Sequence, residues 1–105
     1  MRLLDSSGLL VVAGGTAQTD ATLLINGMNG ILTAASGSGV ILNLNSGTSD
    51  TQVVYNGGAN AVKVYPPVGN KINALSTNGA MTLATNTTCI FFFLSETQII
   101  GVLSA

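Results

Sequence analysis

Residues 51–65 read TQVVYNGGANAVKVY and carry the strongest signal for secondary structure in the chain. Two runs rich in Val and Tyr flank a short polar segment that begins Asn56-Gly57-Gly58. β-Branched and aromatic residues favour strands, and Asn-Gly is a strong signal for chain reversal. We therefore expect a hairpin in which residues 51–55 pair with residues 61–65. Gly57 or Gly58 should have a positive φ in its turn.

The second run alternates in character, which indicates a strand with one buried face. Val62 and Val64 should face the core, whereas Lys63 and Tyr65 should face outward. Short apolar segments separated by Gly, Asn, Ser and Thr continue along the chain, with a turn signal about every eight to twelve residues. The segments that we expect to be strands are residues 9–13, 22–25, 30–34, 39–44, 51–55, 61–65, 71–75, 80–84, 89–94 and 98–103.

Helical signals are weak, because β-branched residues and glycine recur throughout and no capping pattern precedes a stripe of helical period. A chain of 105 residues is expected to form one domain. We therefore predict an all-β, single-domain fold, a sandwich or a jelly-roll-like barrel of about 8–10 short strands, that is oligomeric. Residues 1–20 should be an N-terminal arm or an edge strand, and residues 21–105 should form the β domain.

Charge is scarce in this chain. It has three Lys or Arg residues, four Asp or Glu residues and no histidine. Charged residues make up 7% of the sequence, against about 25% in ordinary soluble domains. Hydrophobic residues make up 47%. A monomer of this composition lacks the charged surface that keeps proteins apart in solution, so we expect copies of the chain or a larger assembly to cover part of it.

The segment at residues 89–94 reads CIFFFL and shows no alternation of apolar and polar residues. Both faces of such a strand should be covered, either in the middle of a sandwich or by a neighbouring subunit. Only the neighbouring subunit would also explain the low charge. The candidate residues for an oligomer or capsid contact are the apolar residues of this segment and of the N-terminal segment: Phe91, Phe92, Phe93, Leu9, Leu10, Val11 and Val12.

The residues that most enzymes require are missing or scattered. Without histidine, no Ser-His or Cys-His nucleophilic pair can form. The single cysteine, Cys89, excludes an intramolecular disulfide and multi-cysteine zinc sites. Asp20, Asp50 and Glu96 could meet as a catalytic pair or a calcium site, but Asp50 and Glu96 lie in polar stretches typical of solvated turns. We expect no enzyme, no catalytic residue, no cofactor and no metal.

Two classes of partner are also disfavoured. Three basic side chains cannot form the positive stripe that phosphate neutralisation requires, so we expect no nucleic acid partner. No apolar run reaches the ~18 residues that a membrane-spanning helix needs, so we do not expect this chain to associate with a membrane. Asp5 follows closely after Arg2, so residues 9–13 make at best a short apolar region of a signal peptide.

Three motifs give the chain a resemblance to a known family. Residues 35–42 read ASGSGVIL, residues 54–67 read VYNGGANAVKVYPP, and residues 69–75 read GNKINAL. Asn78, Ala80 and a Phe-rich strand leading to Thr97-Gln98 follow. This order resembles a family of small virion proteins of tailed bacteriophages. Residues 44–50 depart from the family pattern.

The resemblance implies a virion structural role, namely a capsid decoration or cement protein on the capsid surface that contacts the major capsid protein. Such proteins sit at threefold positions of an icosahedral shell, so a homotrimer is expected. One alternative is a tail or fibre component with a carbohydrate-binding role, for which Tyr55 and Tyr65 could form a stacking platform. A small glycan hydrolase is a further alternative.

Overall fold

The computed structural model of the chain describes residues 10–25, 27–43 and 51–104. Within these ranges the chain forms β-strands and a short 3-10 turn, with no α-helix. The elements are β1 (Leu10–Val12), η2 (Gln18–Asp20), β2 (Thr22–Leu23), β3 (Met28–Thr33), β4 (Gly39–Ile41), β5 (Thr51–Asn56), β6 (Val62–Tyr65), β7 (Lys71–Ile72), β8 (Met81–Leu83), β9 (Thr87–Phe93) and β10 (Gln98–Leu103). Each strand overlaps a segment predicted from the sequence.

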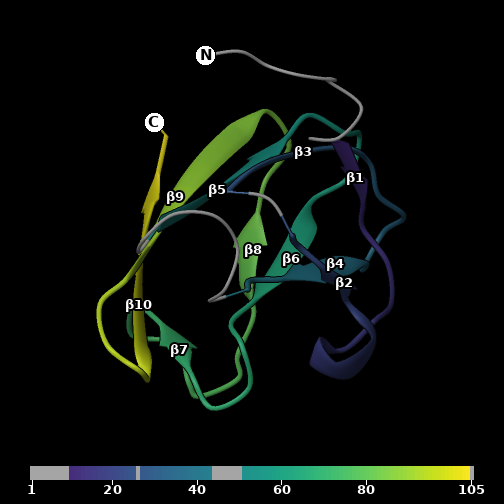
Figure 1. Cartoon of the computed structure of the whole chain (residues 1–105). Coiled ribbons are helices and arrows are strands. Elements are labelled where there is room, and N and C mark those ends of the chain that lie inside the picture. The colour runs from purple at the N-terminus through teal and green to yellow at the C-terminus, as the bar shows by residue number, and fades with distance from the viewer. Residues whose placement is uncertain (1–9, 26, 44–50, 105) are drawn as a thin grey trace.

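The strands form two sheets with the core between them (Figure 1). The large sheet has the order β1-β3-β5-β9-β10-β7, and the small sheet has the order β2-β4-β6-β8. From β1 to β6 the chain alternates between the two sheets, and neighbouring strands of this part are parallel in both. Each pass through both sheets is therefore one coil that stacks on the coil before it.

The alternation makes the fold solenoid-like. β9 then pairs antiparallel with β5, and β8 pairs antiparallel with β6, so these strands extend both sheets beyond the last parallel coil. The all-β fold with two sheets in one domain is confirmed. The jelly-roll barrel is not found, because a jelly roll is built from antiparallel neighbours, whereas β1, β3 and β5 are parallel, as are β2, β4 and β6.

The predicted hairpin between residues 51–55 and 61–65 is wrong. β5 lies in the large sheet and β6 in the small sheet, so the segment between them turns a corner and does not reverse the chain. The buried side chain of Asn56 holds this corner. Its Nδ2 donates to Asn60 O at 2.9 Å and to Leu83 O at 3.0 Å, and its Oδ1 accepts from Gly58 N at 3.0 Å. Backbone groups that neither sheet can satisfy are thereby paired.

The glycines of this corner are needed for space. Neither Gly57 nor Gly58 has a positive φ, so the predicted left-handed turn conformation is wrong. A Cβ atom built on Gly57 would lie 2.6 Å from Cε2 of Tyr55 and 2.8 Å from Cδ2 of Leu32. Both distances are shorter than van der Waals contact, so any larger residue at position 57 would displace these side chains.

A second buried amide ties two further corners together. Gln52 is fully buried, and its Oε1 accepts from Asn43 N at 2.9 Å. Its Nε2 donates to Leu24 O at 3.4 Å. Asn43 follows β4 and Leu24 follows β2, so one side chain of β5 bonds the backbone of two earlier coils. Neutral amides therefore link the stacked coils without any charge in the interior.

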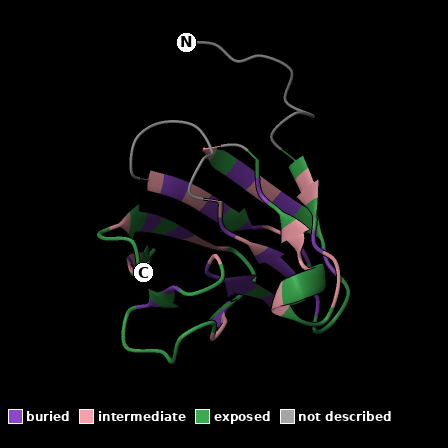
Figure 2. Ribbon diagram, turned by 60° about the horizontal axis from the view of Figure 1, so that its bottom comes forward, coloured by how far each residue is buried: buried purple, intermediate pink, exposed green. Residues whose placement is uncertain are grey.

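The apolar core fills the space between the sheets, and buried and exposed residues alternate along the strands (Figure 2). Val62 and Val64 face the core, as predicted, and Lys63 is exposed. The largest fully buried side chain is Phe91. A Cβ at Gly101 would lie 3.1 Å from Cε1 of this ring, so the glycine leaves room for it on the neighbouring strand.

The corner amide gives the first prediction. Replacing Asn56 with Ala should lower the free energy of unfolding by about 3 kcal/mol, because several buried backbone groups lose their partner and each costs about 1–3 kcal/mol. Urea denaturation measures this change. Asn86→Gly is the control, since it removes an exposed amide at a residue with φ 63°, which glycine readily adopts. Equal losses in both variants would contradict the role of Asn56.

Candidate interaction surface

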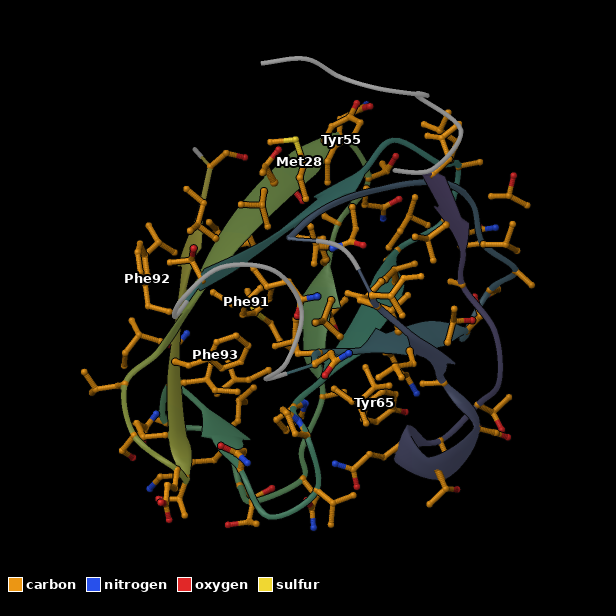
Figure 3. The ribbon with its side chains drawn as sticks, in the orientation of Figure 1. Met28, Tyr55, Tyr65, Phe91, Phe92 and Phe93 are labelled. Atoms are coloured by element: carbon orange, nitrogen blue, oxygen red, sulfur yellow. The ribbon has the colours of Figure 1, made fainter. Side chains whose placement is uncertain are left out.

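Burial alternates along β9, although its sequence does not alternate. Cys89 and Phe91 are fully buried, whereas Ile90 and Phe92 are exposed. Phe93 is partly buried against the core. Figure 3 shows Phe91 and Phe93 directed into the domain and Phe92 directed away from it. The sandwich therefore covers only one face of this strand, so the first of the two predicted arrangements is wrong. Cover of the other face by a neighbouring subunit stays a prediction.

The strand registers place four apolar side chains in one row on the outside of the large sheet. Met28 pairs with Val53, Val53 pairs with Ile90, and Ile90 pairs with Val102. Side chains directly opposite each other on neighbouring strands have Cβ atoms about 4.5–5.5 Å apart. The row therefore runs without interruption across β3, β5, β9 and β10.

Two further rows flank this one. On one side Thr51 pairs with Phe92, which pairs with Ile100. On the other side Leu10 pairs with Gly30, and Gly30 pairs with Tyr55. We call the outward side chains of these rows the large-sheet face; its apolar members are Leu10, Met28, Val53, Tyr55, Ile90, Phe92, Ile100 and Val102.

The large-sheet face is open to solvent in the single chain. Met28 is 58% exposed and Val102 is 52% exposed, although each has apolar neighbours on the sheet. Figure 3 shows Met28 and Tyr55 on the same side of the large sheet. The face is therefore a contiguous apolar surface of the kind that marks sites of protein contact.

The large-sheet face also lacks charge. Among the described residues the charged side chains are Asp20 in η2, Lys63 in β6, Lys71 in β7 and Glu96 in the β9–β10 turn. None of them belongs to β1, β3, β5, β9 or β10. An apolar surface without charge is poorly suited to water and to charged ligands, and it is well suited to burial in an assembly.

The outer side of the small sheet differs, because the chain covers part of it. Tyr65 alternates with the core residue Val64, yet its ring is buried, so the predicted exposure of Tyr65 is wrong. The segment before β2 lies against it: Tyr65 Oη donates to Thr16 O at 3.3 Å, and Gln18 Nε2 donates to Pro66 O at 2.8 Å. The connection between β1 and β2 thus covers Tyr65.

The suggested platform of two tyrosines does not form. Tyr55 lies on the large sheet, whereas Tyr65 lies on the small sheet beneath the covering segment. The two labelled rings are well separated in Figure 3. Since the predicted hairpin would have brought them together, the platform fails for the same reason as the hairpin.

The remaining candidate contact residues lie at the start of the chain. Leu10–Val12 form β1, an edge strand of the large sheet. Leu10 and Val12 are exposed, and Val11 packs against the core. Leu9 lies outside the described residues. Only part of the predicted N-terminal contact therefore faces outward.

The described residues contain little that could carry chemistry. No group of three or more His, Cys, Asp or Glu side chains that could hold a metal occurs among them, and Asp50 lies outside them. Burial raises the pKa of the Cys89 thiol to about 11, so it is almost entirely protonated at neutral pH. In the described part of the chain no helix has the length and apolar character to span a membrane.

Comparison with known proteins returned no similarity. A scan against protein-family models, a search of curated proteins and a search of solved structures each gave no match.

Asp20 fixes the segment that covers Tyr65. Its Oδ1 accepts hydrogen bonds from Ala17 N at 2.8 Å and from Thr16 N at 3.0 Å. These backbone bonds, that of Ala17 above all, hold the pKa of Asp20 below its ordinary value of 3.8. A carboxyl whose pKa is lowered on folding stabilises the fold above its unfolded pKa, and this contribution is lost as the pH falls through the folded pKa.

We therefore predict that Asp20→Asn destabilises the protein at pH 5 and that the difference from wild type shrinks towards about pH 2. Urea denaturation midpoints measured across this range test the prediction. A difference that stays constant with pH would show that the charge of Asp20 contributes nothing to stability.

Proposed function

We propose that this chain is a capsid decoration protein of a tailed bacteriophage. The observation that carries the proposal is the large-sheet face, an apolar surface whose five described strands carry no charged residue. Contiguous apolar surfaces of this kind mark interaction sites. The setting in a virion is supported by the resemblance of the motifs between residues 35 and 98 to small virion proteins.

In this role the protein acts mechanically and needs no cofactor. Copies of the protein, expected to be homotrimers, would sit on the capsid surface and bridge neighbouring copies of the major capsid protein. Apolar and backbone contacts would resist the pressure of the packaged DNA. Buried Gln52 links successive coils through hydrogen bonds, and buried Asn56 links the last coil to β8. These bonds support a rigid domain that can transmit such a load.

The solenoid-like stacking favours a second candidate, a component of the tail or of a fibre. β1 and β2 belong to the same coil and are edge strands of the large and the small sheet. Further coils can stack on such an end, as they do in elongated solenoid proteins. A tail or fibre component accounts for the parallel coils, whereas a decoration protein accounts better for the resemblance of the sequence motifs to small virion proteins.

Immunogold labelling distinguishes these two roles. An antibody raised against the purified protein is applied to intact virions of the phage that encodes the chain. The decoration role predicts gold particles over the head, and the second candidate predicts them over the tail or fibres. Two results together would contradict both roles: the virions carry no gold label, and mass spectrometry does not detect the protein in the same virion preparation.

A stability assay tests the mechanical role. Virions that lack the protein should release their DNA at a lower temperature than wild-type virions, and purified protein added back should restore the release temperature. The release is followed with a DNA-binding dye. If loss of the protein leaves the release temperature unchanged, the protein does not reinforce the capsid.

A further inference from the structure

We infer that the large-sheet face is a contact between copies of this chain. The inference deepens the proposed structural role, on which it rests, by naming the occupant of this surface as a second copy. Two properties of the face support it: the lack of charge on its strands and its geometry.

The lack of charge favours a second copy over a different protein. Contacts between unlike proteins commonly use complementary charges for orientation and rapid association. The five described strands of the large-sheet face offer none, and the nearest charged strand residue, Lys71, lies at the rim of the face, where it pairs with Gln98 of β10. Contacts between identical subunits are more apolar and are depleted in charge, which is the composition of this face.

The geometry suits packing of this sheet on the same sheet of a second copy, a twofold contact that joins two copies and does not by itself build the expected homotrimer. Sheets stack face to face at about 10 Å, with the side chains of the two faces interdigitating. The row from Met28 to Val102 supplies such side chains on four adjacent strands. Gly30 lies between Leu10 and Tyr55 in the next row and adds no side chain of its own there.

The face is smaller than a standard interface between proteins. Five strands at about 4.8 Å spacing cover about 19 Å, and about five residues along each cover roughly 17 Å. This projected area of about 300 Å² matches the largest apolar patches found on monomers. A standard contact buries about 800 Å² on each partner, so side-chain relief and the polar rim must add the remainder. We therefore expect weak self-association, at micromolar concentration or above.

The small sheet offers no equivalent surface. Its Tyr65 is already covered by the segment that contains Thr16 and Gln18. Exposed Lys63 lies on the same side of β6 as Tyr65, so burial of this side against a second copy would also desolvate a charge. Among the described residues the large-sheet face is therefore the broader apolar surface, and its nearest charged strand residue, Lys71, lies at its rim and not within it.

The test compares two substitutions of the same type. Val102→Lys places a charge within the large-sheet face. Val68→Lys makes the same change at a residue that is 72% exposed in the loop after β6, away from the face. Sedimentation velocity over a concentration series gives the mass of each protein, with 10.6 kDa for one chain. Circular dichroism and thermal melting check that each variant is folded.

Wild type and Val68→Lys should associate at micromolar concentration or above, and Val102→Lys should weaken the association at least about tenfold, because its charge would be buried without a partner. Should Val102→Lys fail to fold, Met28→Lys replaces it, since Met28 is the more exposed member of the same row. A wild type that stays monomeric over the series overturns the inference. An oligomer that neither face variant weakens overturns it equally.

Virion binding separates this inference from the proposed function. If the face variants stay oligomeric but no longer bind particles, the capsid occupies the face and the inference fails while the function stands. If the face variants dissociate but wild-type protein is not found on virions, self-association stands and the proposed function fails.

Discussion

A chain that alternates between two sheets must turn a corner after every strand, and each corner carries backbone groups that the sheets cannot pair. In this protein buried side-chain amides satisfy those groups. Asn56 bonds the corner after β5 and the backbone of β8, and Gln52 bonds the corners after β2 and β4. These bonds favour stacking of the coils, because an unpaired buried polar group costs more than a typical hydrogen bond contributes. Neutral amides meet this need, which is compatible with a chain that has little charge.

Sequence patterns located the strands well and their partners poorly. Alternation and β-branched residues correctly indicated strands around residues 51–55 and 98–103. Pairing depends on the direction in which the chain leaves each strand, and the same Asn-Gly dipeptide serves different purposes. Asn78 has a positive φ and lies in a turn, and Asn29-Gly30 lies within β3. The side-chain amide of Asn56 instead points into the corner after β5 and forms hydrogen bonds there. A local pattern does not distinguish these cases, because the difference lies in what the rest of the fold places around the amide.

For the interaction surface too, the general character was easier to predict from the sequence than the particular residues. The shortage of charge predicted that copies of the chain or a larger assembly cover part of its surface, and this stays a prediction. The particular residues were harder to predict, since Phe91 points inward and Phe92 outward within an unbroken apolar run. Met28 precedes the predicted strand at residues 30–34, and its alignment with Ile90 depends on the registers of β3, β5 and β9 together. The register between strands that are distant in the sequence cannot be predicted from a local window of sequence.

Coverage of the large-sheet face by another copy is the central claim, and thiol labelling measures it most directly. Cys89 is buried with a pKa of about 11, so a cysteine introduced by Val102→Cys or Val68→Cys is the only reactive thiol expected in the folded chain. The rate of modification by a maleimide is measured for both variants over a dilution series. The account predicts that the thiol at position 102 is protected at high concentration and becomes reactive on dilution, while the thiol at position 68 reacts rapidly throughout. Equal and concentration-independent rates at the two positions would contradict it.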